Sequence, residues 1–260
     1  MRDTACPLLP KVLAAALCLA LFGFNGCRSD REAIGPDADR LPERAPAAVY
    51  GLVSPFDADA RRVAAGEVAK RGLVRKPGYA ELLIELTTDE DPTVRAAAVR
   101  ALMTEPAVSD APAMIALLDN RVAYVRWEAA AALGRLHAPE STEALMQAAR
   151  NDEVPIVRLA AAKALGQYRE PMVFDVLVGV LDDRDAGVTA AAQRSLSLLT
   201  GQDLGPEPAD WARWAADNRA NLFAEARPYV YEPYPRSPYF YERLTPWDED
   251  KSPPRAPAGL

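Results

Sequence analysis

A hydrophobic pattern recurs at an almost constant interval along the middle of this 260-residue chain. Four valines, three of them followed by arginine, lie 31, 32 and 31 residues apart, and a leucine follows each valine eight residues later. A fixed period of this size is typical of one supersecondary unit stacked on copies of itself. It predicts an all-α fold, a right-handed α-solenoid of helix pairs. The valine and leucine positions are Val94/Leu102, Val125/Leu133, Val157/Leu165 and Val188/Leu196.

Each valine starts the buried face of a helix. The residues four and seven positions after it are alanine or serine, and with the valine and leucine they form one stripe at helical periodicity. Small residues let neighbouring helices approach closely, and a single pair buries too little apolar surface to be stable alone. We expect second helices at about 92–103, 123–136, 155–168 and 186–199, and first helices at about 79–86, 111–118, 141–150 and 172–181.

The repeated unit resembles a HEAT repeat, especially the short, alanine-rich HEAT-like repeats related to those of phycobilin lyases, over about residues 78–200. Those families place an acidic residue six positions before the arginine. The resemblance implies a structural ladder, in which this side chain satisfies turn amides and pairs with the arginine of its own repeat. Asn120 and Thr189 break the charge pattern, so we expect weaker rungs in the second and fourth repeats. The ladder residues are Asp89, Arg95, Asn120, Arg126, Asp152, Arg158 and Asp183.

The start of the chain has the features of an export signal. An apolar run over residues 12–24 is too short for a membrane span of ~20 residues and suits a signal peptide, here residues 1–26. The run ends in Phe24-Asn25-Gly26-Cys27, which resembles the lipobox of bacterial lipoproteins. The resemblance implies acylation of Cys27 and a membrane-anchored protein of the cell envelope, facing the periplasm or the cell surface. An ordinary cleaved signal or an uncleaved anchor is the alternative.

Composition divides the rest of the chain. Residues 27–56 are charged and proline-bearing and are expected to form a flexible tether, whereas 57–225 are expected to form the solenoid with capping helices. The Thr-Gly-Gln-Asp run at 200–203 and the later Trp211-x-x-Trp214 resemble the ending that follows HEAT-like repeats in some bacterial envelope proteins. These two rings are expected to cover the end of the stack. Residues 226–260 are rich in proline and tyrosine and should form an extended tail.

Charge and residue usage argue against several classes of function. The formal net charge of -7 argues against nucleic-acid binding, which rests on phosphate neutralisation. All three cysteines lie in the first 27 residues, and the chain has one histidine, so we expect no cofactor and no metal site. The carboxylates near residues 89–91 and 182–185 are interpreted as helix caps. We therefore expect no catalytic residues and a protein that is not an enzyme.

The stripe of the second helices that points away from the core is the candidate partner-binding surface. It comprises positions two, six and nine after each valine, and HEAT-type solenoids generally present second helices on their concave side. It is mildly basic and apolar, which favours an unidentified protein or peptide partner with acidic or carboxylate groups. The alternative is that the chain's own tail covers it. The candidate residues are Trp127, Leu159, Arg100, Lys163 and Arg194.

Three functions remain open at this point. The first is a non-catalytic protein-binding or scaffolding module, tethered to the membrane of the cell envelope through an N-terminal lipid. The second is a bilin-lyase-like enzyme or chaperone-like factor that uses the solenoid groove. The third is a structural envelope component that acts through its Pro/Tyr-rich tail.

Overall fold

The computed structural model describes residues 40–42, 45–233 and 253–260. The expected signal peptide and the expected lipidation site, Cys27, lie outside these ranges, as does the part of the expected tether before residue 40. Within them the chain is helical, and its extended backbone pairs only at two isolated bridges. The predicted all-α solenoid is confirmed.

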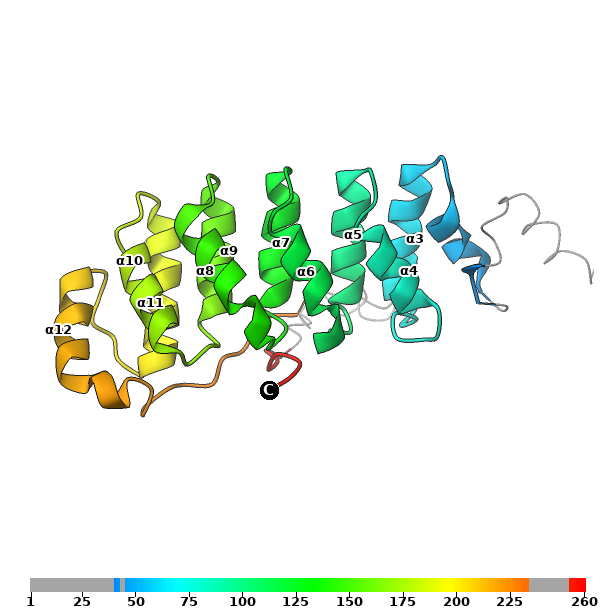
Figure 1. The fold of residues 1–260 in the computed structure, drawn as a ribbon. Coiled ribbons are helices and arrows are strands. Elements are labelled where there is room, and N and C mark those ends of the chain that lie inside the picture. Colours follow the sequence, from blue (N-terminus) through cyan, green and yellow to red (C-terminus); the bar gives the residue numbers. More distant parts are fainter. Residues whose placement is uncertain (1–39, 43–44, 234–252) are drawn as a thin grey trace, which may run out of the picture.

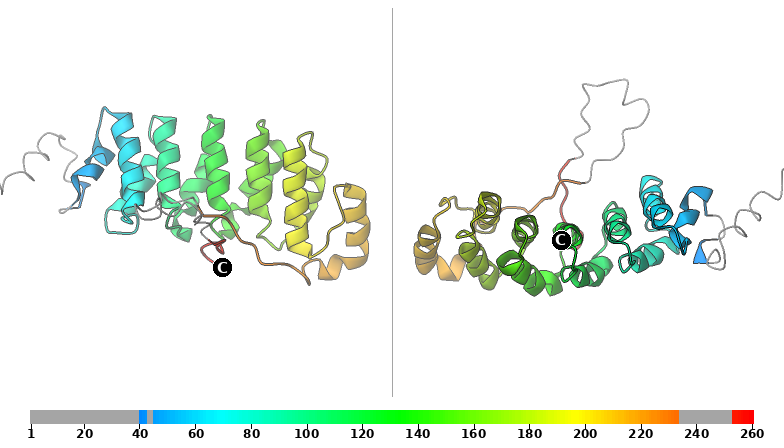
Figure 2. Two further views of the ribbon diagram at one scale, coloured as in Figure 1. Left: turned by 180° about the vertical axis from the view of Figure 1, so that it is seen from behind. Right: turned by 90° about the horizontal axis from the view of Figure 1, so that it is seen from above.

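The helices stand side by side in two rows (Figure 1). Seen from above, the stack curves gently, and the second helix of each repeat lies on the inner side of the curve (Figure 2). The first helices are α4 (Tyr79–Leu86), α6 (Ala111–Leu117), α8 (Thr142–Asn151) and α10 (Pro171–Val180). The second helices are α5 (Pro92–Leu102), α7 (Ala123–Leu133), α9 (Pro155–Leu165) and α11 (Ala186–Thr200). Short 3₁₀ turns, η3 (Val108–Asp110) and η4 (Pro139–Ser141), lead into α6 and α8.

The sequence period is reproduced in the core. All four repeat valines and all four repeat leucines are completely buried. The alanines four residues after each valine are also completely buried, so the second helices pack closely along one face. Because each helix pair contributes only this thin apolar layer, the stability of the repeats depends on stacking.

The start of the stack differs from the expected tether. Residues 47–53 form a 3₁₀ helix, η2, with Val49 and Leu52 buried against α3 (Ala58–Lys70). Proline and charge earlier in this region suggested a flexible chain, but the short apolar stretch from Ala45 to Val53 packs on α3. Residues 45–53, which composition assigned to the tether, therefore belong to the folded stack, and η2 with α3 forms a degenerate helix pair.

The other end of the stack is closed by α12 (Pro208–Asn218), followed by η5 (Arg219–Asn221). The Trp211 ring is completely buried and its indole N–H donates to the Gly205 carbonyl oxygen at 2.8 Å. Phe174 of α10 lies 6.4 Å from the Trp211 ring and 6.3 Å from the Trp214 ring, measured between centroids. The Trp211 and Trp214 rings thus lie next to Phe174 of the last repeat.

Candidate functional site

One edge of the solenoid is formed by the turns that precede the second helices. In each of the four turns the acidic or amide side chain accepts a hydrogen bond from the main-chain N–H two residues later, at 2.8–3.0 Å. This interaction fixes the turn and directs the side chain inward. The accepting residues are Asp89, Asn120, Asp152 and Asp183, which are the predicted ladder positions.

The arginines pair with the following repeat, and the expected pairing within one repeat is wrong. Arg126 donates two hydrogen bonds to Asp152, at 2.7 and 2.9 Å, and Arg158 donates two to Asp183, at 2.6 and 2.8 Å. Within its own repeat, Arg158 reaches only the main-chain carbonyl oxygen of Asp152, at 2.8 Å. Each carboxylate is turned toward the preceding repeat by its bond to the turn amide, so it meets that repeat's arginine.

Because each arginine pairs with the following repeat, the contact that lacks a carboxylate lies at a different place from the one expected. Asn120 faces Arg95, with 3.4 Å between its Oδ1 and the arginine Nη2, whereas Arg126 has a full carboxylate partner. Arg95 also donates to the Asp89 carbonyl oxygen at 2.6 Å. The uncharged contact is therefore between the first and second repeats.

Both ends of the ladder are closed. At the start, Arg61 of α3 donates to Asp89 at 2.6 and 3.0 Å, a rung that the sequence pattern missed because Arg61 precedes Arg95 by 34 residues. At the end, Thr189 replaces arginine and its hydroxyl donates locally to the Asp183 carbonyl oxygen at 3.2 Å. No buried arginine is thus left facing the end of the stack.

The ladder is buried and electrostatically balanced. The Arg126 and Asp152 side chains are 10% and 7% exposed. Burial alone raises the Asp152 pKa, but the hydrogen bonds from Arg126 and the Val154 amide outweigh it and hold this pKa below its ordinary value. The Arg158 hydrogen bond likewise lowers the pKa of Asp183, against the opposing effect of burial. Paired and hydrogen-bonded charges of this kind indicate a structural role.

The predicted partner-binding residues lie on the inner row of helices, with different surroundings. Lys163 of α9 and Arg194 of α11 are exposed, and neither forms an ion pair within the described part of the chain. Arg100 of α5 is paired with Glu128 of α7, whose side chain is 2% exposed. Arg100 therefore contributes less free positive charge than its sequence position suggests.

The apolar members of the stripe are half-buried. Trp127 and Leu159 both pack against the core, and the Leu159 side chain approaches Gly187 at the start of α11. The positions nine residues after the valine, expected on the exposed stripe, are buried in the first three repeats. The second helices end before those positions, and the chain there turns toward the next repeat. The buried residues are Met103, Gly134 and Gly166.

The opposite edge, where the second helices end, is in contact with the tail. Residues 226–233 return from α12 along this edge (Figures 1 and 2). Arg227 donates its main-chain N–H to the Leu198 carbonyl oxygen and its guanidinium to the Gly201 carbonyl oxygen, both at 2.7 Å. The described tail residues thus contact the ends of the second helices.

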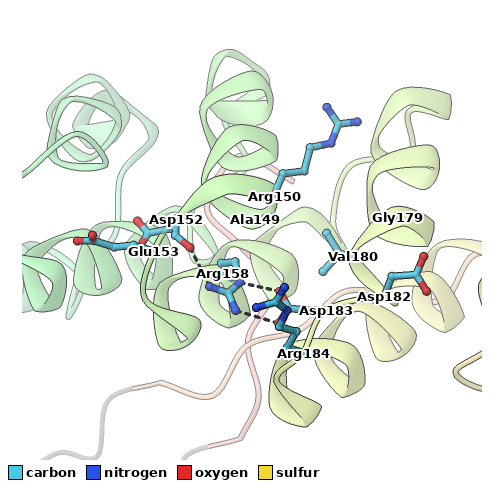
Figure 3. A pocket seen from close by; sticks show the side chains of 10 residues that line it. All are labelled: Ala149, Arg150, Asp152, Glu153, Arg158, Gly179, Val180, Asp182, Asp183 and Arg184. Atoms are coloured by element: carbon cyan, nitrogen blue, oxygen red, sulfur yellow. Dashed lines mark hydrogen bonds and ion pairs between the residues drawn. The ribbon is translucent and has the colours of Figure 1, made fainter.

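A shallow hollow of about 510 Å³ lies on the ladder edge between the third and fourth repeats. Figure 3 shows Arg158 within it, held between the Asp152 main chain and the Asp183 carboxylate. Arg150 and Arg184 are exposed at the rim beside four carboxylates, so the charges largely cancel. The hollow has no concentrated charge and no unpaired buried group that would select a ligand. Its lining residues are Ala149, Arg150, Asp152, Glu153, Arg158, Gly179, Val180, Asp182, Asp183 and Arg184.

No three histidine, cysteine, aspartate or glutamate side chains of the described residues are grouped so as to hold a metal ion. In the same ranges, none of the helices combines the length and the apolar character that crossing a bilayer requires.

Comparison with known proteins identifies the repeat. A model of HEAT repeats matches residues 45–130 and again residues 111–197, which together cover more than half of the chain. No curated protein matches. Among solved structures, the crystal structure of an engineered protein is similar, with 19% sequence identity, a TM-score of 0.50, and coverage of 70% of this chain and 99% of that one. At this identity the likeness concerns the fold alone. The family match and the inter-repeat ladder agree, and the chain belongs to the HEAT repeat family.

Proposed function

We propose that this protein is a non-catalytic scaffold that binds an acidic protein or peptide along the inner face of its second helices. HEAT repeats suggest a protein-binding or scaffolding module, and proteins of this family are generally non-catalytic. The observation that supports the proposal most directly is a pair of exposed cations on neighbouring inner helices, Lys163 and Arg194, which form no ion pair with the described residues. The half-buried Trp127 and Leu159 beside them offer apolar contact area.

Positive charge on the inner face favours an acidic partner at that face alone, because the molecule as a whole is acidic. A chain with a net charge of -7 repels an acidic partner at long range, so binding requires a local positive surface. Lys163 and Arg194 supply it, and they lie away from the ladder, where every buried cation has an acceptor. An acidic partner is thus directed to the inner face.

Charge reversal tests the proposal without disturbing the core. Lys163→Glu with Arg194→Glu replaces two exposed side chains, whereas Trp127→Ala would also remove core packing. The matched control is Arg150→Glu with Arg184→Glu, which makes the same change of charge at two exposed arginines on the ladder edge. We expect the inner-face variant to bind a glutamate-rich probe peptide at least about tenfold more weakly than the control variant. Equal loss in both variants would assign the effect to net charge and reject the inner face.

We further propose that the scaffold is held at a membrane of the cell envelope by acylation of Cys27. The support is the short apolar run followed by Gly26-Cys27. Several acyl chains anchor a protein stably, whereas one chain holds it reversibly. Intact-mass measurement and membrane fractionation of the wild type and Cys27→Ala test this. A mature chain that begins at another residue, or carries no acyl group, would reject the anchor and leave the binding proposal standing.

A further inference from the structure

The loop that follows α7 makes main-chain contacts with the last residues of the sequence. The Ala258 N–H donates to the Arg135 carbonyl oxygen at 3.0 Å, and the His137 N–H donates to the Ala258 carbonyl oxygen at 2.7 Å. The two segments run parallel at a bridge between Leu136 and Ala258. This is the geometry of strand addition, in which an extended peptide is recognised through its backbone.

Small residues make the close approach possible. Pro257 is buried and Ala258 packs against the core. Gly259 has φ of +102°, and a Cβ atom there would lie 2.7 Å from Val108 Cγ2 and 2.8 Å from the His137 carbonyl oxygen. Leu260 is 67% exposed. The contact therefore selects a short stretch of small residues in one backbone conformation and does not use the final side chain.

A second tail segment extends the same contact. The Arg135 guanidinium lies over the Tyr231 ring, 5.5 Å from its centroid, and donates to the Glu232 carbonyl oxygen at 3.4 Å. Tyr231 and Arg255 form an antiparallel bridge with two main-chain hydrogen bonds of 2.9 Å. Loop 135–137 is thus paired with residues 255–258, which are paired in turn with Tyr231.

The pairing requires a donor that a neighbouring repeat lacks. The position equivalent to His137 in the first repeat is Pro106, 31 residues earlier, and proline has no N–H. In the second repeat the donor is present, and the His137 ring is fixed by stacking on Tyr168 at 5.1 Å between centroids. The first repeat therefore cannot form the same pair of hydrogen bonds.

We propose that Val108 and loop 135–137 form a docking site for extended peptides, and that residues 255–260 are its built-in, displaceable occupant. The segment is held by two main-chain hydrogen bonds to the loop and one buried proline, which is a small contact. A covalent connection makes such a contact persist because it raises the local concentration of the segment. A partner with a similar proline-alanine-glycine stretch and further contacts would displace it. The site is separate from the cationic inner face and does not rest on the function proposed for it.

The test uses the full chain and a labelled peptide with the sequence of residues 253–260. The Gly259→Val variant should release the built-in segment, because its Cβ would overlap Val108 and His137. Leu260→Ala is the matched control in the same segment, since this side chain is largely exposed. We expect Gly259→Val to bind the peptide at least tenfold more tightly than the wild type or Leu260→Ala. A peptide that itself carries Gly259→Val should not bind.

Hydrogen exchange at the His137 amide gives an independent readout. We expect this amide to exchange at least tenfold faster in Gly259→Val than in the wild type, with Leu260→Ala unchanged, and circular dichroism to show the same helix content in all three. Equal peptide binding by the wild type and Gly259→Val, no binding by either, or equal exchange at His137 would each overturn the proposal.

Discussion

The two edges of the solenoid are built by different means. On the edge where second helices begin, one set of contacts repeats, because at successive junctions an arginine reaches the turn of the next repeat. On the edge where second helices end, the contacts are individual, and the tail pairs with the loop after α7. The first edge joins neighbours, whereas the second joins segments far apart in the sequence. Repetition thus stabilises the stack, and the irregular edge leaves room for a specific function.

The largest expected loss in the free energy of unfolding comes from a substitution on the ladder edge. Asp152→Ala leaves the Arg126 guanidinium buried without its carboxylate and also removes the acceptor of the Val154 amide. Breaking one partner of a buried pair costs about 3–5 kcal/mol, and we expect the free energy of unfolding, measured in urea, to fall by this amount. Glu153→Ala is the control, because Glu153 also contacts Arg126, at 3.3 Å, but its side chain is 80% exposed. That variant should lose less than about 1 kcal/mol.

Lowering the pH should reduce the stability that the ladder edge contributes. The pKa values of Asp152 and Asp183 are lowered in the folded protein, so the folded state binds fewer protons than the unfolded chain near pH 4. Their stabilisation is complete above the ordinary aspartate value of 3.8 and is lost as pH falls below it toward the folded pKa values. Asp183→Asn should be less stable than the wild type at about pH 7, and its free energy of unfolding should fall less between about pH 5 and about pH 2, the range in which aspartate titrates. An unchanged slope would show that Asp183 does not contribute.

The weak rung can be strengthened. Asn120→Asp places a carboxylate opposite Arg95 while keeping an acceptor for the Val122 amide. Hydrogen bonds to charged groups contribute about 1 kcal/mol more than neutral ones, so we expect a gain of about that size in the free energy of unfolding. The same substitution in an Arg95→Ala background should give no gain. A gain that persists there would place its origin outside the rung.

The smallest global effect is expected on the tail edge. Tyr231→Ala removes the ring under Arg135, and a partly exposed cation–π contact contributes about 0.5–1 kcal/mol. We expect thermal unfolding of the stack to change little, with faster hydrogen exchange at the Arg255 amide, which donates to the Tyr231 carbonyl oxygen. A loss as large as that of Asp152→Ala would mean that the two edges do not differ as described.

The repeats could be predicted because their signal is periodic. Four copies of the same valine, alanine and leucine spacing define the buried face, and α4 begins and ends at the expected residues. The ends of α7 and α9 come three residues earlier than expected, where Gly134 and Gly166 follow the last helical leucine. The hydrogen bonds to the turn amides, which the family resemblance implied, join residues that are two apart in sequence.

The ion-pair partner of each arginine could not be predicted from the spacing of residues in the sequence. Arg158 lies six residues from Asp152 and 25 residues from Asp183, and only the three-dimensional stacking brings it to the second carboxylate. The burial of Trp127 and the pairing of Arg100 with Glu128 likewise depend on the neighbouring helix. The docking of residues 255–260 rests on main-chain groups and small residues, which produce no periodic pattern.

The central claim is that the ladder couples successive repeats, and double-mutant cycles at Arg158 test it most directly. One cycle combines Arg158→Ala with Asp183→Ala, and the other combines Arg158→Ala with Asp152→Ala, each measured by urea unfolding. The structure predicts a coupling energy above about 1 kcal/mol with Asp183 and a smaller coupling with the Asp152 side chain, to which Arg158 makes no hydrogen bond. Stronger coupling with Asp152 than with Asp183 would contradict the account and return the ladder to pairs within single repeats.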